Sequence, residues 1–299
     1  MASAGRAIAG AGVAAALSVF LMSCGQGGDP PVSGGPGKAP AATSRLDPPS
    51  PAPQADPLSA AAASYLAGRS GTVLAAVYDV RTGQSWRLGD GRAQPEASVV
   101  KLDIIETLLA EQGGAALPAS DRALAQAMIE NSDNDAATSL WDDAGGAAGL
   151  MSYNGQAGLT QTTPSPCVAC AGFAWPGWGL TTTMPQDQLT LLKQLVVPGP
   201  HPLLSDAERS YVLSLMENVA PGQRWGISGG VPGGVTVALK NGWLPLNSAN
   251  TNWQVNSVGW VSGEGRDYLI AVLSTGNPTE QYGIDTIGAL SSLIWSAMR

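Results

Sequence analysis

Segments with the pattern of β-strands occur near both ends of the apolar part of this 299-residue chain, and helical patterns fill the space between them. The strand-like segments are rich in β-branched and aromatic residues and are bounded by turns. They are Thr72–Val80, a short piece through Trp86 and Leu88, Val235–Trp243, Trp253–Val261 and Tyr268–Ser274. Neither end makes a full sheet alone, so we expect the two ends to pair into one antiparallel sheet of about five strands.

Apolar residues recur at helical spacing in the rest of the chain. The predicted helices cover residues 58–66, 98–111, 121–130, 136–144, 147–156, 184–197, 205–219 and 283–298. We therefore predict an α/β (α+β) fold in which terminal helices flank the antiparallel sheet and the middle helices form an inserted, all-helical lobe. A cleft between two lobes is a common place for a ligand site.

The first 24 residues read as a secretory signal. Arg6 provides a positive start, and Ala7–Met22 is apolar but shorter than the roughly 20 residues that span a membrane. The segment ends in Leu21-Met22-Ser23-Cys24, which resembles the lipobox of bacterial lipoproteins. We expect Cys24 to be lipidated, with an ordinary signal peptide and an incidental cysteine as the alternative.

Residues 25–56 are dominated by Gly, Pro, Ser and Ala, with few apolar side chains to bury. Such a segment is typical of an extended tether, and residues 57–299 are expected to form the folded domain. Signal, lipobox and tether together predict an exported protein in the cell envelope, lipid-anchored at the outer face of the cytoplasmic membrane.

The formal net charge is −8 and no cluster of lysines and arginines forms a basic stripe, which argues against a nucleic-acid partner. The only histidine, His201, lies in a proline-rich turn, VVPGPHPLL, and is interpreted as a surface residue. A zinc site of the HExxH type needs two histidines and is excluded. We expect a monomer that needs no cofactor.

Three short motifs stand in order along the folded part: Ser98-Val99-Val100-Lys101, Ser132-Asp133-Asn134 and Lys240-Asn241-Gly242. Their order and context resemble the serine β-lactamases and penicillin-binding proteins, whose signature is S-x-x-K, S-D-N and K-T-G. The resemblance covers about residues 57–299. It implies a serine hydrolase that forms an acyl-enzyme on Ser98, with a β-lactam or a peptidoglycan-like peptide as substrate.

Elementary chemistry supports the first motif. Ser98 begins a predicted helix, and Lys101 lies three residues on, so both side chains share one face. A lysine acts as a base only when neutral, which requires burial or a nearby cation such as Lys240. The alternative is that Ser98 only caps the helix and Lys101 is solvated.

The resemblance also implies roles for other residues. Ser132 would relay a proton to the leaving nitrogen, Asn134 would bond the substrate amide, and Asp133 would point away and fix its loop. The N–H groups of Ser98 and Trp243 would form the oxyanion hole, and Gly242 would let the substrate approach the strand. Asn241 departs from the family, which has Thr or Ser at this position to bind a substrate carboxylate.

Residues 158–180 contain no Asp or Glu, whereas class A β-lactamases carry in this loop a glutamate that activates the deacylating water. We therefore expect slow hydrolysis of a Ser98 ester. Two other interpretations remain open. One is a catalytically impaired lipoprotein that binds a ligand or peptidoglycan, and the other is a purely structural lipoprotein.

The same loop holds Cys167 and Cys170, which we expect to form a local disulfide in an exported protein; a metal site is the weaker alternative because no second pair or histidine lies near. Residues 226–230 match the G-x-S-x-G hydrolase motif, but a glycine-rich turn follows and no histidine comes later. Nearby Arg224 is a candidate for contact with a substrate carboxylate.

Overall fold

The structure is a computed structural model that describes residues 55–172 and 174–299. The predicted signal segment, Cys24 and nearly all of the predicted tether lie outside these residues. No helix in the described part is long and apolar enough to cross a bilayer.

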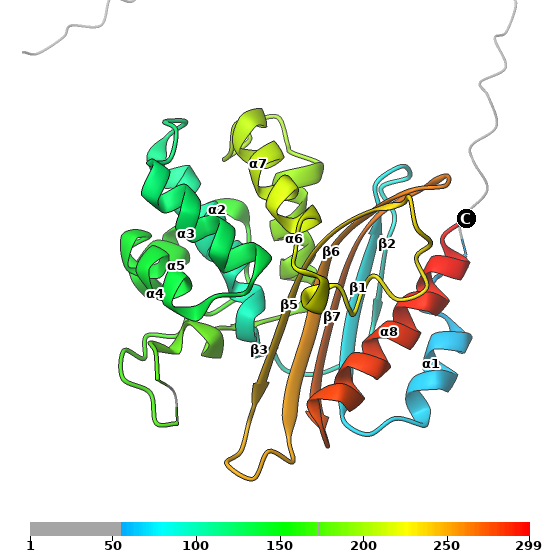
Figure 1. Cartoon of the computed structure of the whole chain (residues 1–299). Helices are drawn as coiled ribbons and strands as arrows, with labels where there is room; N and C mark the ends of the chain where they lie inside the picture. Colours follow the sequence, from blue (N-terminus) through cyan, green and yellow to red (C-terminus); the bar gives the residue numbers. More distant parts are fainter. Residues whose placement is uncertain (1–54, 173) are drawn as a thin grey trace, which may run out of the picture. The chain divides into compact units, whose positions relative to one another are not determined.

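Five strands form one antiparallel sheet in the order β2-β1-β7-β6-β5. Their bounds are β1 Thr72–Asp79, β2 Ser85–Leu88, β5 Thr236–Pro245, β6 Trp253–Gly263 and β7 Arg266–Asn277. β1 pairs with β7 along its whole length, with Val77 opposite Ile270. The two ends of the chain thus complete one sheet, as the sequence predicts (Figure 1).

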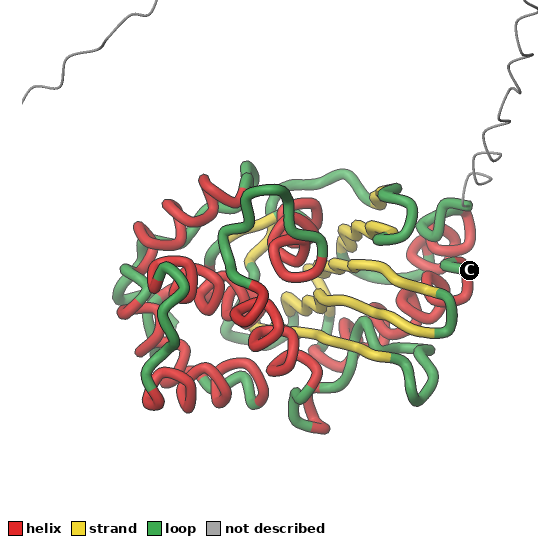
Figure 2. Tube along the Cα trace, turned by 90° about the horizontal axis from the view of Figure 1, so that it is seen from above, coloured by secondary structure: helices red, strands yellow, loops and turns green. Residues whose placement is uncertain are grey.

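Helices cover both faces of the sheet (Figures 1 and 2). The terminal helices α1 (Ala60–Ala67) and α8 (Glu280–Ala297) pack on one face, around a core that includes Val77, Ile270 and Ile294. The other face carries the predicted helical lobe and the larger core. Its helices are α2 Val100–Gln112, α3 Ala119–Glu130, α4 Asn134–Asp143, α5 Gly146–Ala157, α6 Pro185–Val196 and α7 Asp206–Glu217.

A second, two-stranded sheet was not predicted. It pairs β3 (Gln94–Pro95) with β4 (Thr182–Thr183), and Thr163 forms an isolated bridge with Thr182. A strand of two residues is too short to show an alternating pattern. In addition, the two strands lie almost ninety positions apart in the sequence, so nothing local indicates that they pair. This small sheet ties the end of the loop at 158–181 to the chain just before Ser98.

Candidate active site

Ser98 lies in a single 3₁₀ turn, Ala97–Val99, that leads directly into α2. Ala97 has a φ of 51°, a left-handed conformation that a non-glycine residue adopts only when its surroundings hold it there. Two contacts supply that support. The Glu96 N–H donates to the Thr181 carbonyl (2.7 Å), and the Asn256 amide on β6 donates to the carbonyls of Pro95 and Glu96 (both 2.9 Å).

Asn256 is a positioning residue that the sequence analysis missed. It is fully buried on β6 between Val255 and Ser257, close to a second buried amide side chain, Gln254. A buried polar side chain needs hydrogen-bond partners, so the polar residues Gln254, Asn256 and Ser257 among the valines of this strand are the signal that could have revealed it.

Strand β5 passes directly against the start of α2 at Gly242. A Cβ added to Gly242 would lie 2.7 Å from the Ser98 nitrogen and 2.8 Å from the Val99 nitrogen. Only glycine permits this approach. It brings Trp243, the next residue, to the wall of the same cleft as Ser98, which is the placement that the predicted oxyanion hole requires.

Lys101 and Lys240 meet at Ser132. The Lys101 amine contacts the Ser132 carbonyl (2.5 Å), the Ser132 hydroxyl (3.3 Å) and the Asn134 side-chain oxygen (2.7 Å). The Lys240 amine donates to the same hydroxyl (3.0 Å) and to the Asn241 carbonyl (3.0 Å). Ser132 has a φ of 59°, and Asp133 caps α4 by accepting from the Ala136 N–H. The structure therefore brings the three motifs together.

Both lysines are almost completely buried. Burial, reinforced by the charge of Lys240 and opposed by Asp133, lowers the pKa of Lys101 to about 6. Burial lowers the pKa of Lys240 to about 7. At pH 8 the Lys101 amine is therefore mostly neutral, which is the state that accepts a proton. A neutral amine has two N–H groups. They can account for the two shorter contacts, to the Ser132 carbonyl and to the Asn134 side-chain oxygen.

The Ser98 hydroxyl makes no hydrogen bond to any described residue, and it is half-buried at the cleft wall. The sequence places Ser98 and Lys101 on one face of the helix, but the structure shows no hydrogen bond between the Ser98 hydroxyl and the Lys101 amine. Catalytic contacts of this kind are often loose before substrate binds. Asn134 keeps its amide N–H₂ available, because only its oxygen is used by Lys101.

Asn241 does not line the cleft beside Ser98. Its amide donates to the carbonyls of Gln223 (2.6 Å) and Trp225 (3.2 Å), and its oxygen accepts from the Ser257 hydroxyl (2.6 Å). Both amide hydrogens are thus used within the protein. The geometry does not support the predicted substrate-binding role for Asn241, since a short strand residue held by three internal bonds has no donor left to offer.

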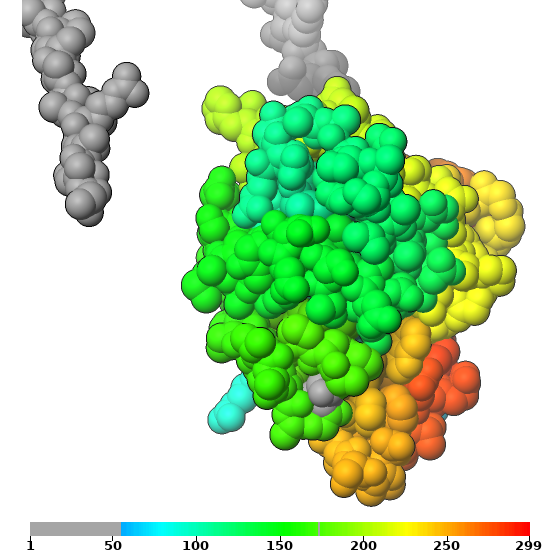
Figure 3. Space-filling view, turned by 60° about the vertical axis from the view of Figure 1, so that its left-hand side comes forward, coloured from blue at the N-terminus to red at the C-terminus, as the bar shows by residue number. Residues whose placement is uncertain are grey.

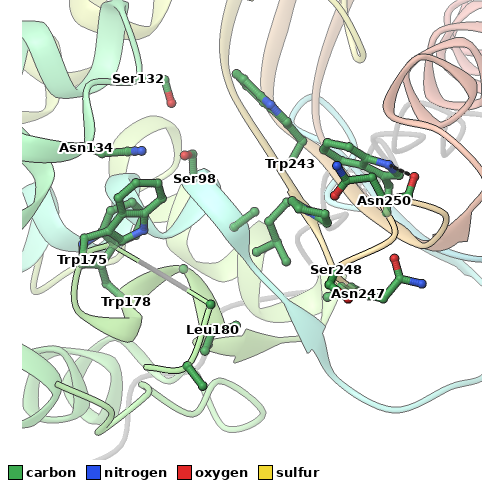
Figure 4. Close-up of a pocket in the computed structure, with 18 of the residues that line it drawn as sticks. Ser98, Ser132, Asn134, Trp175, Trp178, Leu180, Trp243, Asn247, Ser248 and Asn250 are labelled. Carbon is green, nitrogen blue, oxygen red and sulfur yellow. Dashed lines mark hydrogen bonds between the residues drawn. The ribbon is translucent and has the colours of Figure 1, made fainter. Parts of the chain in front are cut away.

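The cleft beside Ser98 has a volume of about 780 Å³. Figure 4 shows Ser98, Ser132 and Asn134 around one space, with Trp175 and Trp178 on one side and Trp243 on the other. The loop at 158–180 and the tip of the β5–β6 hairpin form its two outer walls and lie side by side in Figure 3.

A disulfide joins Cys167 and Cys170 within the loop. Trp178 is buried there, stacks on Trp175 at 5.9 Å between ring centroids, and places its ring 5.0 Å from the Lys101 amine. Where a class A enzyme is expected to carry a carboxylate, this loop therefore presents an indole to the lysine.

The structure separates the remaining candidates from the cleft. His201 is exposed on the connection between α6 and α7. The Arg224 guanidinium donates to the Glu217 carbonyl at the end of α7, and the Ser228 hydroxyl donates to the Arg224 carbonyl. In the described part of the chain, no group of three or more metal-binding side chains converges.

Buried carboxyl groups lie beneath the site and were not predicted. Burial, with added repulsion from Asp103 and Asp187, raises the pKa of Glu96 well above its usual range. Burial raises the pKa of Asp103 on α2 to about 7, against hydrogen bonds from Asn154 and Thr107. Burial also raises the pKa of Glu106, whose carboxyl accepts from the Tyr153 hydroxyl. Glu96 precedes the turn that carries Ser98, and Asp103 and Glu106 lie on α2. Acidic side chains usually face solvent, so nothing in the local sequence indicated that these three are buried.

The sheet, the inserted helices and the Ser98–Lys101–Ser132–Lys240 cluster define a serine β-lactamase or penicillin-binding type of protein. Residues 112–298 match the Beta-lactamase enzyme family, and the chain belongs to that family. The predicted fold and resemblance are thereby confirmed.

Solved structures share this fold at low sequence identity. The extended-spectrum β-lactamase TLA-1 has a TM-score of 0.69 at 18% identity, covering 80% of this chain and 97% of that chain. An ancestral class A β-lactamase (GNCA) has a TM-score of 0.64 at 23% identity, covering 80% and 99%. PBP-A has a TM-score of 0.61 at 22% identity, covering 76% and 90%.

A curated relative is named "Putative lipoprotein LppW" and comes from Mycobacterium tuberculosis (strain ATCC 25618 / H37Rv); the protein of the same name from Mycobacterium bovis matches equally. It is 28% identical over 215 residues. The match covers 70% of this chain and 64% of the relative, so the chain spans less than two thirds of that protein's length.

Proposed function

We propose that this protein is an exported, lipid-anchored serine acyl-transfer enzyme that forms a Ser98 acyl-enzyme with amides or esters and releases it slowly. The observation that carries the proposal is the meeting of Lys101 and Lys240 at the Ser132 hydroxyl, beside a cleft that Ser98 lines. β-Lactams and cell-wall peptides are the amide substrates that the family resemblance suggests.

The chemistry follows from the positions of the groups. Ser98 Oγ attacks the substrate carbonyl, and a Ser98 O–C bond forms as the carbonyl π bond opens. The Ser98 proton passes to the neutral Lys101 amine. The oxyanion is held by the N–H groups of Ser98 and Trp243. When the C–N or C–O bond to the leaving group breaks, the proton returns through Ser132 to the leaving atom.

The loop at 158–180 supports the proposal that release is slow. Hydrolysis of the Ser98 ester needs a base that activates water, and the loop has no Asp or Glu in its sequence. The side chain that it presents to Lys101 is the Trp178 ring. An indole accepts no proton from water, so the ester is expected to persist.

A second candidate function is ligand binding without turnover. Two observations favour it: the Ser98 hydroxyl has no hydrogen bond to a described residue, and Asn241 replaces the usual Thr or Ser with an amide bound inside the protein. In that case the cleft would bind a peptidoglycan-like peptide or another ligand reversibly.

Export and anchoring belong to the same proposal. The lipobox-like Leu21–Cys24 segment motivates lipidation at Cys24, and the relative named as a lipoprotein is consistent with it. Metabolic labelling with an alkyne fatty acid should mark the wild-type protein in a bacterial host. Labelling that persists in Cys24→Ala would contradict the assignment.

Intact-protein mass spectrometry tests the enzymatic proposal. The protein is incubated with benzylpenicillin and, separately, with an uncharged alkyl fluorophosphonate. A stable adduct of either reagent on the wild type, lost in Ser98→Ala, is the expected result. Failure of both reagents to label the wild type, or equal labelling of Ser98→Ala, would favour the binding function.

A further inference from the structure

The wall of the Ser98 cleft carries no charge. None of the described residues that line it is an Asp, Glu, Lys or Arg. Its polar groups are hydroxyls and amides, including Ser132, Asn134, Asn247 and Asn250. These groups bind neutral carbonyls and N–H groups well, but none provides a full positive charge for an anion.

The positions from which a cation might reach the cleft are occupied by other interactions. The Asn241 amide holds the 223–225 loop, and the Arg224 guanidinium bonds to Glu217. Lys101 and Lys240 are buried behind Ser132 and do not line the cleft. Burial also leaves the Lys240 amine, with its pKa near 7, largely uncharged at pH 8.

The remainder of the wall is apolar and aromatic. It combines two groups from opposite sides of the cleft: Trp175, Trp178 and Leu180 from the loop, and Trp243, Leu244, Leu246 and Trp253 from the β5–β6 hairpin. Trp175 stacks on Trp178, and Trp243 meets the Trp225 ring edge to face at 5.7 Å. Figure 4 shows Trp175 and Trp243 facing the space around Ser98 from its two sides.

A carboxylate entering this cleft would lose hydration without gaining a cation, which is costly, whereas an apolar group would gain by leaving water. The net charge of −8 adds a weaker, salt-screened repulsion of anions. We propose that the Ser98 site selects uncharged substrates: esters or amides of an apolar acyl group whose leaving group carries no carboxylate. This inference rests on the proposed Ser98 acyl-transfer function and narrows its substrate class.

A matched pair of aryl esters tests the proposal. Both carry the same phenylacetylglycyl acyl group; the leaving group is 3-hydroxybenzoate in one and the neutral 3-hydroxybenzamide in the other. Acylation of the full-length protein is followed at pH 8 and physiological ionic strength, with rates corrected for spontaneous hydrolysis. We expect the neutral ester to acylate Ser98 at least tenfold faster. An equal or faster reaction of the carboxylate ester would overturn the proposal.

A variant locates the cause. Gln223 lines the cleft beside Asn241, so Gln223→Lys places a cation next to the leaving group. The rate ratio should shift at least threefold towards the carboxylate ester. Asn218→Lys adds the same charge at the exposed end of α7, outside the cleft, and should keep the wild-type ratio. Equal shifts in both variants would mean that overall charge, not the cleft, sets the preference.

The apolar half is tested with p-nitrophenyl acetate and hexanoate. The hexanoate should acylate Ser98 at least tenfold faster, and Trp175→Ala should reduce this advantage. Rates independent of chain length would overturn the apolar assignment. The two reagents used for the enzymatic proposal separate the two levels. No adduct on Ser98 from either benzylpenicillin or the fluorophosphonate refutes acyl transfer itself. A Ser98 that is labelled, but is acylated by neither the neutral aryl ester nor p-nitrophenyl hexanoate, refutes only the substrate class.

Discussion

The backbone of Gly242 lies against the amide nitrogen of Ser98, so close that a single added methyl group would sit 2.7 Å from that nitrogen. The contact joins the third sequence motif to the first across the boundary between sheet and helical lobe. It fixes the spacing between the two N–H groups expected to bind the oxyanion, those of Ser98 and Trp243.

We predict that Gly242→Ala lowers the acylation rate by roughly 100-fold or more, the effect of losing one oxyanion donor. The methyl group would press on backbone atoms of Glu96, Ser98 and Val99, which cannot rotate away. Gly155→Ala on α5 is the control, because its Cβ would meet open space. Rates are measured with the fluorophosphonate, and an unchanged rate in Gly242→Ala would contradict the predicted oxyanion hole.

The acylation rate should depend on pH through Lys101. Burial lowers the pKa of Lys101 to about 6, so its base form is lost as pH falls below that value. We expect a plateau above about pH 7 and a tenfold fall per pH unit well below 6, measured by stopped-flow with a neutral ester.

The charge of Lys240 contributes to the lowered pKa of Lys101. In Lys240→Met that charge is gone, so the pKa of Lys101 should rise and the acid limb of the profile should move to higher pH. A limb that stays in place would show that a group other than Lys101 accepts the proton.

Asp103 should make stability depend on pH. Burial raises the pKa of Asp103 to about 7, so the folded state keeps a proton that the unfolded chain releases near pH 4. The stabilising contribution is complete below about pH 4 and is lost as pH rises through 7.

Asp103→Asn removes this titration and keeps an acceptor for Asn154. The difference in melting temperature between the variant and wild type should be more positive at pH 8 than at pH 5, by roughly 4 °C or more. Asp143→Asn, at an exposed position on α4, should show no such difference. If Asp103→Asn changes the melting temperature by the same amount at pH 5 and pH 8, the carboxyl group of Asp103 does not titrate with a raised pKa.

The Cys167–Cys170 disulfide should stabilise the loop modestly. The bond closes a very short loop and so reduces the conformational entropy of the unfolded chain. This raises the free energy of the unfolded state by about 2 kcal/mol. Cys167→Ser with Cys170→Ser should therefore lower the free energy of unfolding by about that amount. Ala171 and Gly172, which line the cleft, follow directly, so ester acylation should also weaken. Identical denaturation curves with and without reductant would contradict a formed disulfide.

Periodicity and turn residues were sufficient to predict the sheet from both chain ends and nearly all the helices. The predicted strand Thr72–Val80 is observed as β1 at Thr72–Asp79, and the predicted helix 205–219 as α7 at Asp206–Glu217. The strand is a continuous apolar run bounded by turns, and the helix repeats its apolar positions at helical spacing, so local sequence alone indicates both elements. The motif order also pointed to Ser98, Lys101, Ser132 and Lys240.

Tertiary structure decided what surrounds those residues. It turned the Asn241 amide inward, set Asn256 against the turn before Ser98 and buried Glu96 and Asp103 beneath the site. It also brought Trp178 against Lys101 and left the cleft wall without charge. The sequence determined which segments become helix or strand, because that choice depends on neighbours a few positions away. Hydrogen-bond partners, burial and pKa values depend on groups far apart in the chain, so only their packing together fixes them.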